Sequence, residues 1–191
     1  MMAALTPKAV FLRMQEATAG QDTIYNFHCI VRMADFLLET ELFPREVLEA
    51  YSRKNLGKAL HPTDIACFSS QRGGPQGDYS LGMGDKIVNV VDCLNRFPQS
   101  KRAVITIANN AYASHTVDSD AKCIREIHFH LHPGPRLDAS VFFRAHAVEI
   151  FPKNIHFLGT LMTELSERLD CRPHLGDLFL VATQLSSTRM S

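Results

Sequence analysis

The chain has 191 residues, enough to bury one sizeable hydrophobic core, and we predict a single domain over residues 1–191. Twenty basic residues balance twenty acidic ones, so the charge gives no sign of a nucleic acid or a membrane surface as partner. Five cysteines without a CxxC pair, and an N-terminus without the apolar core of a signal peptide, predict a reduced, cytoplasmic protein.

The first half of the chain predicts two helices and a long loop. Residues 23–42 place apolar side chains three and four positions apart, which predicts an amphipathic helix. A shorter helix is expected over residues 44–52, with Pro44 in its first turn. Residues 69–84 are rich in glycine and polar residues and predict a long loop, a kind of segment that usually binds a ligand or is disordered.

The second half predicts helices interspersed with strands. Helical periodicity returns over residues 85–98 and again over residues 151–170. Apolar and β-branched runs predict four strands, the middle two joined as a hairpin: residues 102–110, 123–132, 137–145 and 176–185. Helices mixed with hairpin-linked strands favour an α+β domain with one large mixed β-sheet flanked by helices.

The stretch CIREIHFHLHPG carries a histidine at every second position: His128, His130 and His132. Because side chains alternate along a strand, these histidines should share one face with Ile124 and Glu126 and point away from Cys123. Neighbouring Cβ atoms on that face lie about 7 Å apart, so all three imidazoles converge on one zinc ion only awkwardly. We therefore predict a polar surface of the sheet, with a metal site as the alternative.

Six short segments carry a family resemblance through their order along the chain and their spacing, although no single one of them is diagnostic. They are DKI at 85–87, PQSKR at 98–102, AKC at 121–123, RAHA at 144–147, FPKN at 151–154 and GD at 176–177. In these segments the chain resembles the thymidylate synthase family, which includes the pyrimidine hydroxymethylases. The resemblance runs from Asp85 to Leu180, about half of the chain.

The resemblance implies a thymidylate synthase-like fold and a one-carbon transfer from 5,10-methylenetetrahydrofolate to carbon 5 of a pyrimidine nucleotide. In that reaction a cysteine thiolate adds to carbon 6 of the ring, and Cys123 occupies the position of this nucleophile. Arg144 would contact both the nucleotide phosphate and the sulfur, because a nearby cation favours the thiolate. Asn154 would recognise the O4 and N3 edge of the ring with an amide that is both donor and acceptor.

The family is a homodimer in which two sheets pack back to back, and the resemblance places a basic pair at that interface. Lys101 and Arg102 match the pair that reaches the phosphate bound by the other subunit. Asp177 belongs to the Gly-Asp segment, and we group it with the substrate-binding residues. Tyr79, in the glycine-rich loop, is a candidate for the active-site tyrosine, and His146 is a candidate general base near the substrate.

Each of these residues also has an ordinary structural interpretation. Cys123 could be a small buried side chain, and Asn154 could be the N-cap of the helix that follows it. Lys101 and Arg102 could be solvated charges at the start of a strand. The histidine face and the basic pair would then have no part in binding.

The chain also departs from the family pattern. Ala145 and Ala147 replace the serine and the aspartate of the family's Arg-Ser-x-Asp segment, and the chain has no tryptophan to pack on a folate. No segment matches the usual C-terminal closure, which excludes water from the reactive intermediate. These departures favour hydroxymethylation or an altered substrate. The alternatives are a protein of this fold that acts on a non-nucleotide acceptor, and a non-catalytic dimeric binding protein.

Overall fold

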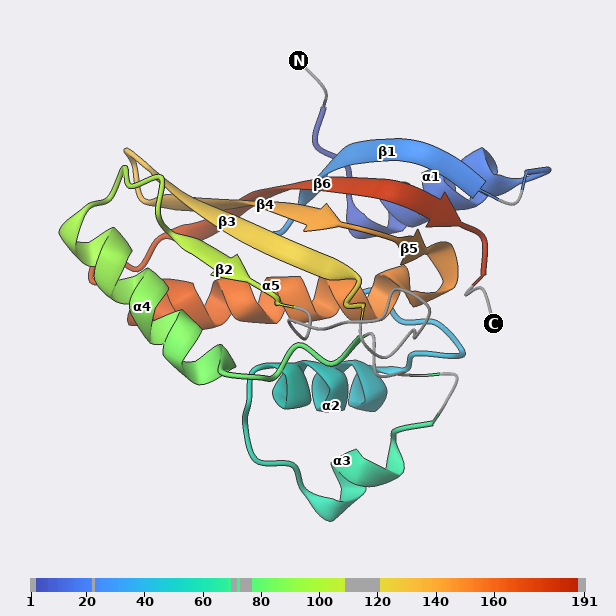
Figure 1. The fold of residues 1–191 in the computed structure, drawn as a ribbon, viewed down its shortest axis with the longest axis horizontal. Helices are drawn as coiled ribbons and strands as arrows, with labels where there is room; N and C mark the ends of the chain where they lie inside the picture. Colours follow the sequence, from blue (N-terminus) through green and yellow to red (C-terminus); the bar gives the residue numbers. More distant parts are fainter. Residues whose placement is uncertain (1–2, 22, 70–71, 73–76, 109–120, 189–191) are drawn as a thin grey trace.

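A computed structural model describes residues 3–21, 23–69, 72, 77–108 and 121–188. Its centre is one sheet of six strands in the order β1-β6-β4-β3-β2, with β5 also paired to β6 (Figure 1). The strands are β1 Thr23–Arg32, β2 Val104–Thr106, β3 Ile124–His132, β4 Arg136–Phe143, β5 His146–Ala147 and β6 His174–Ser186. β6 runs parallel to β4 and β5, whereas the other pairs are antiparallel. The predicted large mixed sheet is confirmed.

The described helices lie on one side of the sheet, in two layers (Figure 1). They are α1 Pro7–Thr18, α2 Arg45–Asn55, α3 Pro62–Ala66, α4 Met83–Arg96, the short 3-10 helix η3 Val148–Ile150, and α5 Phe151–Arg168. α5 runs beneath the sheet, and α2 packs on the side of α5 that faces away from it. Among the described elements, none covers the opposite face of the sheet. No described helix is long and apolar enough to cross a membrane.

α5 is buried on nearly all sides over its first nine residues, from Phe151 to Gly159. A helix with an apolar surface all round must lie between two layers, and α5 packs against the sheet on one side and α2 on the other. The three residues Lys153, Asn154 and His156 are nevertheless polar and are also buried. Buried polar side chains need hydrogen-bond partners, so this turn of α5 must be surrounded by other polar groups.

The helix predicted over residues 23–42 is wrong. The structure has β1 from Thr23 to Arg32, followed by an irregular segment. Phe27 and Val31 are four residues apart, as a helix requires, yet Phe27, Cys29 and Val31 also alternate, and it is this alternating set that is buried. The apolar pattern fits both a helix and a strand. Nine residue pairs join β1 to β6, and this strand pairing selects the extended conformation.

The alternation predicted for β3 is confirmed over most of the strand. Ile127 and Phe129 are buried, while His130 and His132 are exposed on the other face. Ile124 is an exception, since it is fully buried rather than on the histidine face. A β-bulge between Ile124 and Glu126 adds one residue to β3. The side chain of Ile124, before the bulge, therefore lies on the face opposite to the histidines.

The sheet has two ends, which separate the predicted site residues into two groups. At the first end lie the start of β3, the end of β4 and β5, because Ile124 pairs with Phe143 and His146 pairs with Leu185. At the second end lie the β3–β4 turn and the starts of β4 and β6, because Arg136 pairs with His174. We call these the Cys123 end and the hairpin end.

Candidate functional site at the Cys123 end

Four predicted site residues come together at the Cys123 end from different elements. Cys123 precedes β3, Arg144 follows β4, His146 lies in β5, and Asn154 is in the first turn of α5. The backbone nitrogen of Arg144 donates a 2.8 Å hydrogen bond to the Cys123 carbonyl oxygen. These residues span 32 positions of sequence, and the β4–β6 crossover and the β3–β4 hairpin bring them to one place.

Cys123 lies in a polar but shielded environment. Its side chain is 7 % exposed and forms no disulfide. Burial, and next the negative charge of a Cys123 thiolate, raise the pKa of Tyr51 above its ordinary value. The pKa of Tyr79 is also raised, by burial, by Tyr51 and by Cys123. Both phenols therefore stay protonated and lie within electrostatic range of the sulfur.

The guanidinium of Arg144 points toward the segment that leads into Cys123. Its Nη2 donates a 3.3 Å hydrogen bond to the carbonyl oxygen of Ala121, two residues before the cysteine. Its Nε is buried and has no hydrogen-bond partner among the described residues. Arg144 therefore lies near Cys123, as predicted, and its Nε is a donor available to a ligand.

Asn154 is held by hydrogen bonds on both sides of its amide. Its Nδ2 lies 3.3 Å from Nε2 of His146, and its Oδ1 lies 3.3 Å from the hydroxyl of Tyr51. The N-cap interpretation of Asn154 is wrong, because α5 begins at Phe151 and Ile150 is the N-cap residue. Asn154 is 2 % exposed, so its side chain is part of a buried hydrogen-bond network and does not face solvent.

His146 is a buried neutral imidazole. Its Nδ1 lies 2.8 Å from the carbonyl oxygen of Ala147, and its ring packs edge-on against Phe143 at 4.6 Å between centroids. Burial is the main reason that the pKa of His146 is lowered to about 4, and the ammonium of Lys153 lowers it further. A base with so low a pKa removes protons poorly at neutral pH.

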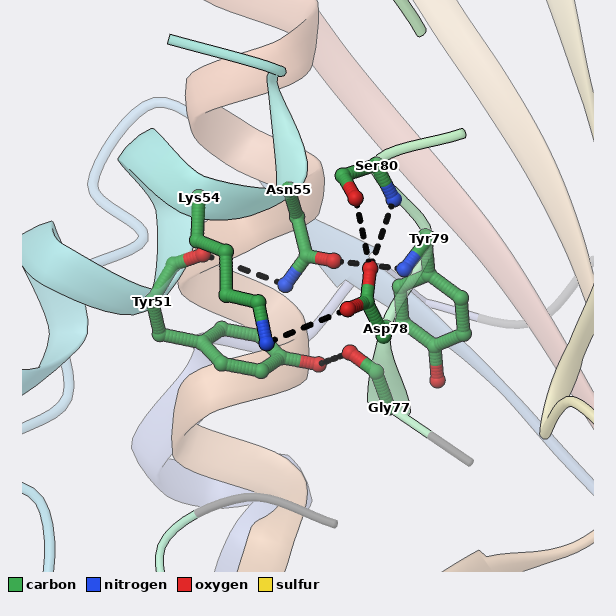
Figure 2. A network of polar contacts seen from close by, with 7 residues as sticks. All are labelled: Tyr51, Lys54, Asn55, Gly77, Asp78, Tyr79 and Ser80. Carbon is green, nitrogen blue, oxygen red and sulfur yellow. Dashed lines mark hydrogen bonds and ion pairs between the residues drawn. The ribbon is translucent and has the colours of Figure 1, made fainter. Parts of the chain in front are cut away.

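Tyr79 belongs to a network that ties residues 77–80 of the predicted glycine-rich loop to α2. Figure 2 shows the backbone nitrogen of Tyr79 donating to Oδ1 of Asn55 at 2.7 Å, and Lys54 paired with Asp78 at 3.1 Å. The hydroxyl of Tyr51 donates to the carbonyl oxygen of Gly77 at 2.9 Å. The Tyr79 ring stacks on Phe157 of α5, with centroids 5.6 Å apart. The predicted tyrosine lies within electrostatic range of Cys123. Residues 70–71 and 73–76 of the predicted loop lie outside the described residues.

Lys153 is a buried cation that sequence patterns did not single out. Its Nζ lies 4.6 Å from the centre of the Tyr51 ring and donates a 3.2 Å hydrogen bond to the carbonyl oxygen of Arg72. A cation above an aromatic ring is attracted by the electron-rich face of the ring. Lys153 and Tyr51 therefore hold the two backbone positions, Arg72 and Gly77, that bracket residues 73–76.

Lys101, Arg102 and Asp177 do not join this site within one chain. Lys101 and Arg102 are exposed in the turn before β2, where Arg102 lies over the Phe97 ring at 5.4 Å. Asp177 is at the start of β6, and its backbone nitrogen donates to Oδ1 of Asp138 at 3.0 Å. All three are at the hairpin end, so a role for the basic pair at a Cys123 site requires a second subunit.

The histidine face also belongs to the hairpin end. His132 pairs with Asp138 at 3.0 Å, and His128 pairs with Glu126 at 3.4 Å. His128 and His130 line a hollow of about 500 Å³ together with Lys101. Within the described ranges, no group of three or more His, Cys, Asp or Glu side chains is arranged to hold a metal ion. The face has the polar character that the alternation predicted.

The residues that the sequence did not identify are polar positions on helices. Tyr51 and Asn55 lie one turn apart on α2, both buried, and the Nδ2 of Asn55 donates to the Tyr51 carbonyl oxygen at 3.1 Å. His156 of α5 lies 2.7 Å from the Ser52 hydroxyl. The available signal was the polar set in the otherwise apolar FPKNIHFLG, since polar side chains within a buried helix must meet partners.

The geometry at the Cys123 end thus combines a shielded thiol, an arginine, two protonated phenols and an oriented amide. A scan of the chain against protein-family models finds no matching family, and a search of curated proteins finds no match in sequence.

Proposed function

We propose that the protein is a thymidylate synthase-like one-carbon transferase that acts on carbon 5 of a pyrimidine nucleotide through a Cys123 adduct. The observation that carries this proposal is the convergence of Cys123, Arg144 and Asn154 at one end of the sheet, with Tyr79 beside them. The sequence resemblance assigns the same residues to one site. Their grouping at one end of the sheet supports the proposal.

The proposed chemistry begins at the thiol. A Cys123 thiolate forms a bond to carbon 6 of the pyrimidine, and the electron pair of the 5,6 double bond moves toward the carbonyl at carbon 4. Carbon 5 becomes nucleophilic and forms a bond to the one-carbon unit, and its proton leaves as that unit separates from its carrier. Addition of water to the resulting exocyclic methylene group expels the Cys123 thiolate from carbon 6, which restores the 5,6 double bond and gives the hydroxymethyl product. Arg144 supports the thiolate as a nearby cation, and the phenol of Tyr79 can donate a hydrogen bond to developing negative charge.

The one-carbon donor expected from the resemblance is 5,10-methylenetetrahydrofolate. The described residues do not supply a fit for it: the chain has no tryptophan, and Asp78, an acid near Tyr79, is engaged by Lys54 and Ser80. This folate is the donor that the sequence resemblance implies. A hydroxymethyl rather than a methyl product remains part of the proposal.

The proposal includes a homodimer formed by the open face of the sheet. Phe142 and Phe179 are each 38 % exposed there, on neighbouring strands, and Val181 lies next to both in the register. Apolar side chains at the middle of an uncovered sheet face are typical of an interface between subunits. Such packing could bring Lys101 and Arg102 of one subunit to the phosphate bound by the other.

The test uses nucleotides and a matched pair of cysteine variants. We expect UMP, dUMP, CMP or dCMP to raise the melting temperature of the protein, and tritium at carbon 5 of the bound nucleotide to be released. Cys123→Ala should abolish tritium release, whereas Cys171→Ala should retain it, because Cys171 is exposed and lies outside the site. If none of the four nucleotides stabilises the protein or loses tritium, the proposed function is wrong.

A non-catalytic binding protein is the second candidate. It is favoured by the burial of the site, since Cys123 is 7 % exposed and Asn154 is 2 % exposed. A thiol that resists alkylation by iodoacetamide in the folded protein, with no nucleotide bound, would support this candidate. A folate that binds, together with a Cys123 adduct on another acceptor, would instead indicate a non-nucleotide substrate.

A further inference from the structure

The orientation of the Asn154 amide follows from the hydrogen bonds of His146. The carbonyl oxygen of Ala147 can only accept, so Nδ1 of His146, 2.8 Å away, carries a proton. In a neutral imidazole the other nitrogen, Nε2, is then an acceptor. Of the two ends of the amide only Nδ2 can donate to it, and the separation is 3.3 Å. The amide oxygen is thereby directed toward Tyr51.

The other side of the amide agrees with this orientation. The Tyr51 hydroxyl lies 3.3 Å from Oδ1 of Asn154 and 2.9 Å from the carbonyl oxygen of Gly77, and it can donate to either. If the amide turned over, its oxygen would face the unprotonated Nε2 of His146, and two acceptors would oppose each other. An unpaired buried acceptor is costly, which disfavours the turned amide.

We propose that His146 is a positioning residue, which holds the Asn154 amide in one orientation and so determines which pyrimidine edge the site accepts. This inference rests on the proposed function. Uracil presents an acceptor at O4 and a donor at N3, whereas cytosine presents a donor at N4 and an acceptor at N3. After His146 and Tyr51 are satisfied, the amide keeps one N–H and one oxygen lone pair, in a fixed spatial order.

A fixed order of donor and acceptor discriminates between these two edges. One base meets a complementary pair, and the other meets donor against donor and acceptor against acceptor, which a site of this kind rejects strongly. An amide that turns freely would accept both. His146 itself is engaged at both ring nitrogens, so its effect on a substrate passes through Asn154.

The experiment compares two buried histidines of which only one touches Asn154. His146→Phe keeps an aromatic ring against Phe143 and Phe151 but removes both nitrogens. His156→Phe is the control, because His156 is buried in the same helix layer and bonds Ser52 instead. Calorimetric Kd values for UMP, CMP, dUMP and dCMP should show a preference of at least about tenfold for one base in the wild type, retained in His156→Phe. His146→Phe should reduce this preference to less than about threefold.

A second measurement does not depend on the nucleotide or on a variant that folds. Nitrogen-15 NMR of the wild-type imidazoles should show His146 neutral, with its proton on Nδ1. A proton on Nε2 would overturn the inference whether or not any nucleotide binds. So would a wild type that binds both bases equally, or a base preference that His146→Phe leaves intact. If no nucleotide binds the wild type, the proposed function fails and the base-edge assignment falls with it, while the tautomer still shows whether His146 orients the amide.

Discussion

Two buried histidines link the protonation of single side chains to the stability of the fold. The pKa of His146 and that of His156 are each lowered to about 4, mainly by burial. In the unfolded chain an imidazole titrates near about 6.5. Between these values the unfolded state binds more protons, so we expect the free energy of unfolding to fall as the pH falls from about 6.5 to about 4. Urea unfolding across this range measures the slope, up to about 1.4 kcal/mol per pH unit for each histidine.

Variants assign that slope to its source. His146→Phe and His156→Phe should each remove part of the pH dependence between pH 6.5 and 4. His174→Gln, which changes an exposed histidine at the start of β6, serves as the control and should leave the slope as it is. An unchanged slope in both buried-site variants would show that other groups dominate acid unfolding.

At Gly159 of α5, the Phe36 ring occupies the space that a Cβ atom would need. A Cβ there would lie 2.2 Å from Cγ of Phe36. We expect Gly159→Ala to lower the free energy of unfolding by about 2–3 kcal/mol, because the Phe36 ring must move. Gly84→Ala in α4 is the control: its Cβ meets nothing within 4 Å, so the change should be neutral or stabilising by up to about 1 kcal/mol. Equal losses in the two variants, measured by urea unfolding, would contradict this account.

Part of the site could be predicted at the residue scale. Cys123, Arg144 and Asn154 were identified because the resemblance tied them to short motifs. Tyr51 and Lys153 were not, because a tyrosine in a polar helix and a lysine beside a proline have no distinctive local pattern. Their importance comes from burial against each other, at 4.6 Å between ammonium and ring, which depends on how α2 and α5 pack.

Among the elements, β1 shows how a strand can resemble a helix in sequence. Its residue Asn26 has a positive φ of 58°, in the left-handed region, and is exposed at mid-strand. Asparagine tolerates that conformation, whereas a β-branched side chain does not. Asn26→Val should therefore destabilise the protein by about 1–2 kcal/mol, although valine is the better strand former. Asn26→Gly should change the free energy of unfolding little, because glycine tolerates a positive φ. Urea unfolding of the two variants compares backbone strain with strand propensity. An Asn26→Val variant as stable as the wild type would contradict this account.

The other elements show which patterns were reliable. The β3–β4 hairpin and the helices α4 and α5 were predictable because each has one clear period, two for the strands and three to four for the helices. The insertion of β6 between β1 and β4 was not, because strand order depends on pairing between residues more than 30 positions apart. The bulge in β3 escaped detection for a similar reason: no glycine or proline marks it.

At the scale of the whole molecule, the open sheet face should determine the state of association. Phe179→Asp places a charge at the middle of that face, on a side chain that is already 38 % exposed, so the fold should survive. If the homodimer uses this face, the variant should sediment as a monomer at concentrations where the wild type is dimeric. Leu81→Asp is the control, since Leu81 is 85 % exposed two residues before α4 and is not part of the sheet. A dimeric Phe179→Asp, or a wild type that is monomeric at all concentrations, would exclude this interface.

The crossover from β4 to β6 contains β5, η3 and α5, and therefore His146, Lys153 and Asn154. The two central strands of the sheet are parallel, so the chain cannot form them without laying this connection across the helical side. Assembly of the sheet and assembly of the polar network are consequently one event. A variant that retains its circular dichroism spectrum and its cooperative unfolding has, by that fact, also positioned the backbone of these three residues. Any activity that it has lost can then be attributed to the altered side chain.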